Sequence, residues 1–191
     1  MDAVSGDQIE LMGARLRLRA PTERDAGFAR DMYSRAEVTR FLGTHDWTET
    51  THEEALARIR RYRERFGPGT GAWLIETLET GSSAGFALMK PIPFSAHVKD
   101  ESAEDIEIGW HLHPDAWGSG YATEAARLLI AHARRAGHRE LAAVTNPENL
   151  ASQRVAARIG MIHQGPSNRY YDTTCELFTL DLSAPPQPTH R

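Results

Sequence analysis

The stretch Ile106–Ala126 holds the clearest chemical pattern in this chain of 191 residues. A strand-like segment enters a loop with two glycines, Gly118 and Gly120, and the loop continues directly into a helix. Glycines let successive backbone N–H groups turn toward one point, and a helix start adds about half a positive charge. Small side chains in the loop would let a phosphate approach the backbone. The segment therefore predicts an anion-binding site suited to a phosphate or pyrophosphate.

Other nucleotide-binding motifs do not match this loop. A phosphate-binding loop of the NTPase type requires Gly-Lys-Ser/Thr after its glycines, whereas this loop reads Gly120-Tyr121-Ala122. A dinucleotide fingerprint needs three spaced glycines and, about twenty positions later, an acidic residue at the end of a second strand. Glu140 has nearly that spacing but begins a strand. A tight strand–helix turn without a ligand stays open as the alternative.

The other reactive residue types give weaker patterns. His111 and His113 lie two positions apart and would share one face of a strand. Two ligands do not form a metal site, and no third His, Cys or carboxylate has a supporting spacing, so we expect no metal. Cys175 is the single cysteine, and we expect it to be a buried strand residue and not a nucleophile.

The glycine-containing stretch resembles the central motif of the GNAT superfamily of acyl-CoA-dependent N-acyltransferases. That motif is Gln or Arg, two residues, Gly, one residue, and Gly or Ala; Trp117–Ala122 matches it, with Trp in the first place. The form W-G-x-G-Y-A-T-E-A is similar to the branch of RimJ/RimL-type ribosomal-protein N-terminal acetyltransferases. Arg15–Ala20 and Val38–Gly43 also resemble that branch, and Asn149–Ser152 followed by Val155 and Gly160-Met161 matches a second family motif. The resemblance spans about Arg15 to Leu182.

The resemblance implies a GNAT fold that binds acetyl-CoA as co-substrate. The strand ending at His113 would splay from the strand Leu141–Thr145 and open a slot for the pantetheine arm. The implied cofactor-binding residues are the backbone groups of His111, Leu112 and His113, the loop and helix residues Gly118, Ser119, Gly120, Tyr121, Ala122 and Thr123, and the side chains of Asn149 and Ser152.

Aminolysis of a thioester needs a neutral amine and a proton for the departing thiolate. Glu107 is the candidate base, because it lies on the strand beside the slot, where the family branch often has Glu; the alternative is a carboxylate that pairs with a basic neighbour. Ser152 is the candidate acid, or a donor to the thioester; the alternative is a polar residue in a first helical turn. Many family members have a Tyr where this chain has Ala156, so Tyr170 or Tyr171 could supply the proton instead.

The elements that position these residues follow from hydrophobic periodicity. We expect strands and helices in mixed order: a strand at 15–19, a helix from Thr22 with Ala26, Ala29, Met32 and Tyr33 inward, a helix at 49–66, a hairpin of strands 72–78 and 84–90, a strand at 105–113, a helix at 120–137, a strand at 141–145, a helix at 149–159 and a strand at 176–182. This order predicts an α/β (α+β) sandwich on a mixed, mostly antiparallel sheet flanked by helices. One domain, 1–191, would have a core of about 14–182 and a loose tail at 183–191. The irregular segment Pro91–Ala103 would lie over a pocket.

The helix at 49–66 combines an apolar stripe with many arginines. The stripe consists of Ala55, Ile59, Tyr62 and Phe66, and the arginines on the other faces are Arg58, Arg60, Arg61, Arg63 and Arg65. We expect the arginines to form a solvated face, with polyanion binding as the alternative.

Composition and charge limit the classes of molecule that this protein is expected to bind. The net charge is −4 with interspersed signs, which argues against direct nucleic-acid binding. No apolar run approaches the roughly 20 residues of a membrane span, no signal-peptide pattern is present, and one cysteine favours a reducing, cytoplasmic location. We expect an amine acceptor, either a protein N-terminus or a small molecule, and a homodimer through exchanged C-terminal strands is plausible. The acidic residues Asp100-Glu101 and Glu104-Asp105 keep an aminoglycoside or polyamine acceptor open, and Ala156 keeps a non-catalytic acyl-CoA sensor open.

Overall fold

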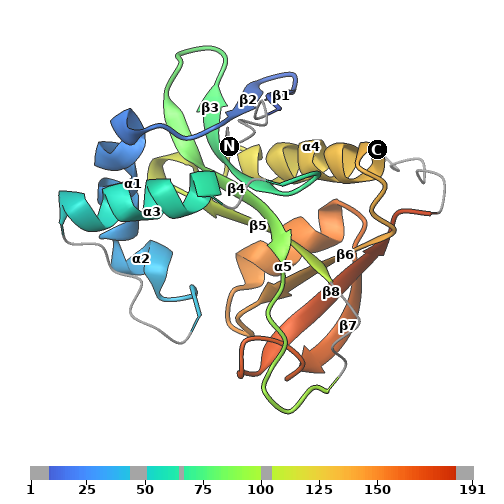
Figure 1. The fold of residues 1–191 in the computed structure, drawn as a ribbon. Helices are drawn as coiled ribbons and strands as arrows, with labels where there is room; N and C mark the ends of the chain where they lie inside the picture. Colours follow the sequence, from blue (N-terminus) through green and yellow to red (C-terminus); the bar gives the residue numbers. More distant parts are fainter. Residues whose placement is uncertain (1–8, 44–50, 65–66, 100–104, 184–191) are drawn as a thin grey trace, which may run out of the picture.

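One sheet organises the protein (Figure 1). The computed structural model describes residues 9–43, 51–64, 67–99 and 105–183, and within them eight strands pair in the order β1-β2-β3-β4-β5-β6-β8-β7. The strands are β1 (Leu11–Met12), β2 (Leu16–Arg19), β3 (Gly71–Thr77), β4 (Ser83–Pro91), β5 (Ile106–Leu112), β6 (Glu140–Thr145), β7 (Ile162–Ser167) and β8 (Cys175–Asp181). Neighbouring strands are antiparallel except β5 and β6, which are parallel. The expected mostly antiparallel sheet is confirmed.

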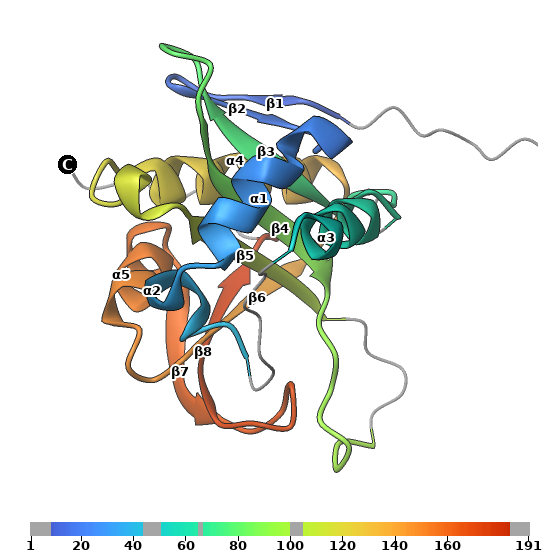
Figure 2. The same cartoon turned by 90° about the vertical axis from the view of Figure 1, so that its left-hand side faces the viewer.

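Helices cover both faces of this sheet (Figure 2). They are α1 (Ala26–Tyr33), α2 (Ala36–Thr39), α3 (His52–Glu64), α4 (Tyr121–Arg135) and α5 (Leu150–Arg158), with short 3-10 turns at Glu23–Asp25 and Pro114–Ala116. In the two views α1 and α3 lie on one face of the sheet and α4 lies on the other. The helices and strands expected from periodicity are therefore present, with small shifts at their ends.

The strands divide their side chains between two cores. Trp73, Met89 and Ile108 pack with Leu129 of α4, whereas Leu74, Phe86 and Leu88 pack with residues of α1 and α3. Alternation along a strand produces this division, because successive side chains point to opposite faces. On β5 the even-numbered residues therefore face α4, and Glu107, Gly109 and His111 face the side of α1 and α3.

The expectation for Arg58 was wrong. Its side chain is buried, at 3% exposure, and its guanidinium lies 4.0 Å from the centre of the Tyr33 ring. Arg58 is one residue before Ile59 and one helical turn from Ala55 and Tyr62, so it borders the apolar stripe of α3 instead of facing water. Stacking on an aromatic face offsets part of the cost of removing the cation from solvent. Phe66 and Arg65 lie outside the described residues.

Three elements were not expected from the sequence: β7, α2 and the two-residue strand β1, which is too short to show an alternation. β7 reads I-H-Q-G-P-S, which lacks an apolar alternation because most of its residues are exposed at the edge of the sheet. A proline is tolerated in an edge strand, where one N–H faces no partner strand. The four-residue helix α2 is too short to give a periodic signal. The proposed tail falls almost wholly on 184–191, outside the described residues.

The central feature for function is the divergence of β5 and β6. These parallel strands share one register pair, Glu107 with Ala142, and their C-terminal halves then separate. The expected splay of the two strands is thus present, and it begins beside Glu107.

We predict that Gly85→Ala destabilises the protein strongly where β4 supports β5. An added Cβ at Gly85 would lie 2.1 Å from the His111 carbonyl oxygen and 2.8 Å from Leu112 Cα, so the strands would have to separate. We expect a loss of about 2–3 kcal/mol in the free energy of unfolding, measured by urea denaturation.

Gly109→Ala is the matched control. Its added Cβ would meet no atom closer than 3.9 Å, and glycine within a strand costs roughly 0.5–1 kcal/mol relative to alanine. This variant should be as stable as the wild type or slightly more so. Equal stability of the two variants would contradict the proposed contact.

Candidate functional site

The loop before α4 has the geometry of an anion site. Gly118 and Gly120 adopt left-handed φ values of 75° and 78°, and Gly120 is the N-cap of α4. Tyr121, Ala122 and Thr123 form the first turn, whose backbone N–H groups have no partner within a helix. A Cβ built on Gly118 would meet no atom within 4 Å, so the space beside the loop is open. The loop can therefore receive an anion against exposed amides and the positive helix end.

Arg15 holds this loop in place, a role the sequence did not reveal. Its backbone N–H and its Nε each donate to the Glu124 carboxylate at 2.8 Å, and its Nη1 donates to the Ser119 carbonyl at 2.9 Å. Its guanidinium also lies over the Tyr121 ring at 5.1 Å. The strand β2 region and the start of α4 are far apart in sequence, so only the fold brings this cation to the loop.

The backbone of β5 offers only some of its groups to the slot. The His113 N–H donates to the Ala84 carbonyl at 3.0 Å and thus faces β4, which corrects the expectation that it binds a ligand in the slot. His111 shares that edge, because antiparallel pairing alternates along a strand. Leu112 faces the other edge, where its carbonyl accepts from the Trp117 indole N–H at 3.0 Å. Of the three positions, only Leu112 therefore directs its backbone N–H and carbonyl toward the slot, and the backbone groups of Trp110 point the same way.

The opposite wall of the slot carries polar side chains near the start of α5. The Thr145 hydroxyl is buried and has no hydrogen-bond partner among the residues described, so a polar ligand group would satisfy it. The Asn149 carboxamide oxygen caps α5 by accepting from the Ser152 N–H at 3.1 Å. Asn149 and Ser152 line the cavity described next, whereas Ala156 is fully buried in the core. An extended ligand with amide groups fits this wall.

A cavity of about 840 Å³ extends from the slot to the side of α1 and α3. Its lining includes Glu107, Gly109 and His111 of β5, Pro91 at the end of β4, and Ile92 and Pro93 of the irregular segment that follows. The described part of that segment therefore borders a pocket, as expected; residues 100–103 lie outside the description. Gly109 adds no side chain to the cavity wall between Glu107 and His111.

Glu107 lies in a polar cluster in this cavity. Lys90, its cross-strand neighbour, places Nζ 2.8 Å from the Glu107 carboxylate, and the Tyr171 hydroxyl donates to the same carboxylate oxygen. Lys90 also donates to the Tyr171 oxygen at 2.5 Å. The alternative reading of Glu107, a carboxylate that pairs with a basic neighbour, is thus present in the geometry. It is compatible with a base, because a carboxylate in such a pair can still accept a proton from an amine that enters the cavity.

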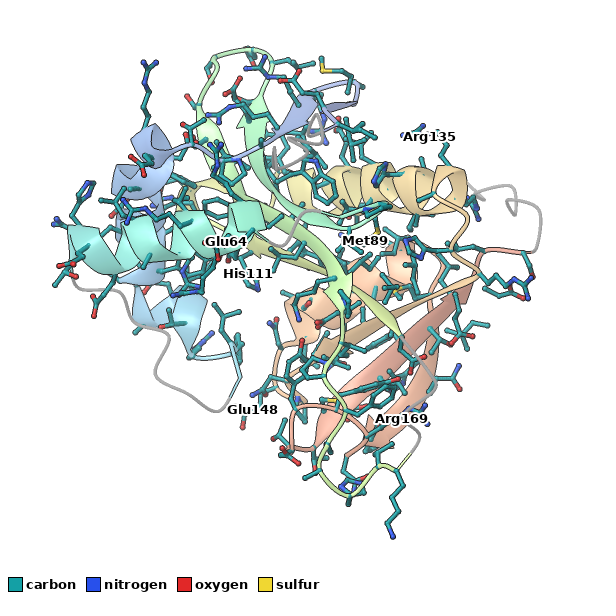
Figure 3. All side chains as sticks on the ribbon, in the orientation of Figure 1. Glu64, Met89, His111, Arg135, Glu148 and Arg169 are labelled. Carbon is teal, nitrogen blue, oxygen red and sulfur yellow. The ribbon has the colours of Figure 1, made fainter. Side chains whose placement is uncertain are left out.

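His111, which Figure 3 labels near the middle of the view, is held neutral by its surroundings. Its Nδ1 lies 2.8 Å from the Tyr33 hydroxyl, which lies 2.8 Å from the Tyr62 hydroxyl. Burial, helped by the nearby Arg58 and Lys90 cations, lowers the pKa of His111 to about 3. A histidine with this pKa lines the pocket as a hydrogen-bonding group and is a poor base at neutral pH.

His113 and Cys175 do not join this cluster of reactive groups. His113 Nε2 lies 2.9 Å from Asp31, and its Nδ1 accepts from the Asp115 N–H, so each histidine of the pair has its own protein partner. Cys175 is a buried residue of β8, as expected. Burial, with Glu107 and Glu176 nearby, raises the pKa of the Cys175 thiol to about 11, which disfavours the nucleophilic thiolate.

The sequence matches a family model described as an acetyltransferase (GNAT) domain over residues 15–162. The chain belongs to the GNAT acetyltransferase family. The expected fold class and enzyme class, an N-acetyltransferase, are thereby confirmed, and acetyl-CoA is the co-substrate of this family. The anion loop, the diverging strands and the unpartnered Thr145 hydroxyl of the slot fit such a ligand.

Individual relatives agree with this assignment. The chain is 32% identical over 107 residues to the FsC-acetyl coenzyme A-N(2)-transacetylase of Aspergillus fumigatus, a match covering 56% of this chain and 45% of that protein. It is 27% identical to the uncharacterized N-acetyltransferase YoaA of Bacillus subtilis, covering 82% and 84% of the two chains. Among solved structures, RimL, a ribosomal L7/L12 alpha-N-protein acetyltransferase in complex with coenzyme A, superposes with a TM-score of 0.72 at 18% identity, covering 91% of this chain and 98% of that one. The expected likeness to the RimJ/RimL branch therefore holds at the level of the fold.

Among the described helices of this GNAT chain, none has the length and apolar character needed to cross a membrane.

We predict that Ser119→Glu weakens CoA binding by roughly tenfold or more, because a carboxylate would repel the phosphates. Ser119 is exposed in the loop and its backbone is not left-handed, so the substitution adds charge without backbone strain. Titration calorimetry with CoA measures the effect. Ser119→Gln, of the same shape without the charge, should bind within about twofold of the wild type; equal weakening by both would argue against an anion at this loop.

We predict that His111 makes the protein less stable in mild acid. The unfolded chain takes up a proton at a pKa near 6.5, whereas folded His111 does not until about 3, so stability falls as pH falls through this window. In His111→Gln the difference in unfolding free energy between pH 7 and pH 5 should shrink by about 1–2 kcal/mol, measured by urea denaturation. The exposed His97→Gln serves as control. An unaltered pH dependence in His111→Gln would show that His111 is not held neutral.

Proposed function

We propose that this GNAT enzyme transfers the acetyl group of acetyl-CoA to a protein N-terminal α-amine. The observation that supports the proposal most directly is the slot between β5 and β6, which has the anion loop of Gly118–Thr123 near its open end and Glu107 where the strands begin to diverge. This arrangement suits a thioester whose phosphates lie at the loop and whose acyl carbon lies close to Glu107.

Within this proposal the slot binds the donor through backbone and side-chain groups. The amides of the loop and of the first turn of α4 hold the pyrophosphate, and the edge of β5 at Trp110 and Leu112 pairs with the pantetheine amides as a ligand strand would. Thr145 and Asn149 contact the arm from the opposite wall, and Ser152 donates a hydrogen bond near the thioester.

Glu107 acts as the general base for the acceptor amine. An α-amine with a pKa near ~8 is about one-tenth neutral at pH 7, whereas a lysine near ~10.4 costs roughly 4–5 kcal/mol to deprotonate. A carboxylate is a modest base, which suffices for the α-amine. The proposal therefore favours a protein N-terminus over a lysine side chain.

Charge in the cavity favours the same acceptor over a polyamine. Among the described lining residues the cations are Arg58, Arg61 and Lys90, and the one carboxylate is Glu107, which Lys90 pairs. Asp105, from the acidic run expected to attract a cation, accepts from the Tyr170 hydroxyl at 2.6 Å, and Asp100–Glu104 lie outside the described residues. A polycation would meet repulsion at this lining, so an aminoglycoside or polyamine is the weaker candidate. The similarity to RimL, a protein named as an alpha-N-protein acetyltransferase, supports the α-amine.

We further propose a cytoplasmic location, consistent with a single buried cysteine, and a homodimer. The exposed edge strand β7 supports contact with a second copy through the C-terminal strands.

The predicted activity is tested by release of CoA thiol with a panel of amines. Peptides beginning Ser-Ala or Ala-Arg should support turnover at least about tenfold faster than an aminoglycoside at equal concentration, because of the amine pKa and the cavity charge. Glu107→Gln should lower kcat by roughly 100-fold with the peptide, since it removes the base.

Glu140→Gln is the matched control, because Glu140 is exposed on β6 and does not line the cavity. Faster turnover of aminoglycosides would reverse the choice of acceptor. Binding of CoA without turnover of any amine would favour the sensor instead of the enzyme.

A further inference from the structure

The turn between β7 and β8 brings a second reactive group to Glu107. Tyr171 lines the cavity, its hydroxyl donates to the Glu107 carboxylate, and Lys90 donates to its oxygen at 2.5 Å. The Lys90 ammonium also lies 5.0 Å from the centre of the Tyr171 ring. Three titratable side chains from three separate segments thus meet at one point of the cavity wall.

The backbone of this turn adopts an unusual conformation to present Tyr171. Tyr171 and Asp172 have left-handed φ values of 60° and 51°, and they are the only non-glycine residues with positive φ in the described chain. Bulky side chains rarely adopt this region, so surrounding contacts must hold the turn in it.

Hydrogen bonds from the segment after β4 provide that restraint. The Tyr171 N–H donates to the Pro93 carbonyl at 3.2 Å, and the Ser95 N–H donates to the Arg169 carbonyl at 2.8 Å. The Ser95 hydroxyl donates to the Asn168 carbonyl at 2.7 Å and accepts from the Asp172 N–H at 2.9 Å. Ser95 is itself buried, at 1% exposure. A strained turn and a buried hydrogen-bond network therefore fix the position of the Tyr171 phenol.

We propose that Tyr171 is the general acid that protonates the departing CoA thiolate, and that it shares a proton with Glu107. This inference rests on the proposed acetyl transfer and adds a catalytic residue to it. Ser152 then acts as a hydrogen-bond donor to the thioester and not as the proton source.

Glu107 and Tyr171 together can carry out every proton transfer that the reaction needs. The amine nitrogen forms a bond to the acyl carbon, and the ammonium proton passes to the Glu107 carboxylate. As the carbon–sulfur bond breaks, the Tyr171 O–H gives its proton to the sulfur, and protonated Glu107 returns a proton to the Tyr171 oxygen. One proton has then moved from amine to thiol, leaving an amide, CoA and an unchanged enzyme. The Lys90 ammonium lies beside both oxygens and stabilises negative charge on either one.

Chemistry favours Tyr171 over the other hydroxyls. A phenol ionises near ~10 and an alkyl thiol near ~8.5, so proton transfer from phenol to thiolate is opposed by a factor of only about 30. Tyr170, the neighbour in the same turn, donates instead to Asp105 and does not line the cavity. Ala156, the place of the usual family tyrosine, is buried in the core and cannot reach the slot.

The charged and titratable groups around Tyr171 come from several elements. Lys90 contacts it from β4 and Glu107 from β5, Cys175 of β8 lines the same cavity, and the adjacent Asp172 carboxylate accepts from the Ala96 N–H at 2.8 Å. His111 lies further along β5 and is neutral over the assay range. Loss of activity at alkaline pH is therefore expected to report the Tyr171–Lys90–Glu107 cluster.

The test is Tyr171→Phe, assayed for kcat and KM with an N-terminal peptide from pH 6 to pH 10.5. The variant keeps the ring and loses the proton, so we expect kcat to fall about 100-fold, with KM for acetyl-CoA within about threefold of the wild type. Wild-type kcat should decline at alkaline pH as Tyr171 loses its proton, and this decline should be absent in Tyr171→Phe. Lys90→Met should move the decline to higher pH, because the phenolate loses its neighbouring cation.

Tyr170→Phe is the matched control, since it removes a tyrosine hydrogen bond of the same turn. It should lower stability and leave the wild-type pH profile of kcat unchanged. An active wild type whose kcat and alkaline decline survive in Tyr171→Phe would overturn the role of Tyr171 alone. A wild type that turns over no amine would overturn the proposed transfer and this role together.

Discussion

The arrangement of the molecule depends on two parallel strands that pair at one point and then separate. β5 and β6 share the pair Glu107 with Ala142 and diverge beyond it, so the edges of Trp110 and Leu112 on one side and Thr145 on the other border a slot. Backbone groups at such an opening need partners, and the protein supplies only some, such as the Trp117 indole at the Leu112 carbonyl. A ligand with spaced amides can provide the remainder, and this physical requirement connects the fold with an acyl-CoA.

The helices on the two faces of the sheet contribute different parts of the site. α4 packs on one face of the sheet and the loop before its N-terminus is the anion loop, which Arg15, just before β2, holds through Glu124 and the Ser119 carbonyl. α1 and α3 cover the other face, where Arg58 stacks on Tyr33 and the tyrosine pair holds His111. The donor can thus approach along one side and the acceptor along the other, with Glu107 between them.

The cavity wall around Glu107 shows how the fold sustains a polar cluster in a partly buried place. Lys90 forms an ion pair with the Glu107 carboxylate across the β4–β5 ladder. Tyr171 lies in a turn whose backbone is strained, with left-handed φ values at Tyr171 and Asp172. The buried Ser95 network balances that strain. Such a cluster leaves no isolated charge in the low-dielectric wall.

Local patterns in the sequence determined a large part of this picture. The glycines of Trp117–Ala122 and the helix after them predicted an anion loop, the alternation of Leu16 and Leu18 predicted a half-buried strand, and the order of elements indicated a mostly antiparallel sheet. These features depend on neighbouring residues, whose chemistry the sequence states directly. The elements that escaped prediction, such as β7, carry no periodic signal because they lie exposed at an edge.

The tertiary structure alone decided which distant residues meet. Lys90, Glu107 and Tyr171 come from three separate segments, and Arg15 and Ser119 are more than a hundred residues apart in the chain, so no local spacing predicts either contact. Arg58 became buried because Tyr33 from another helix offered a ring to stack on, and the His113 N–H faced β4 because strand pairing set its direction. Side-chain partners and backbone edges follow from packing and register, which are properties of the whole chain.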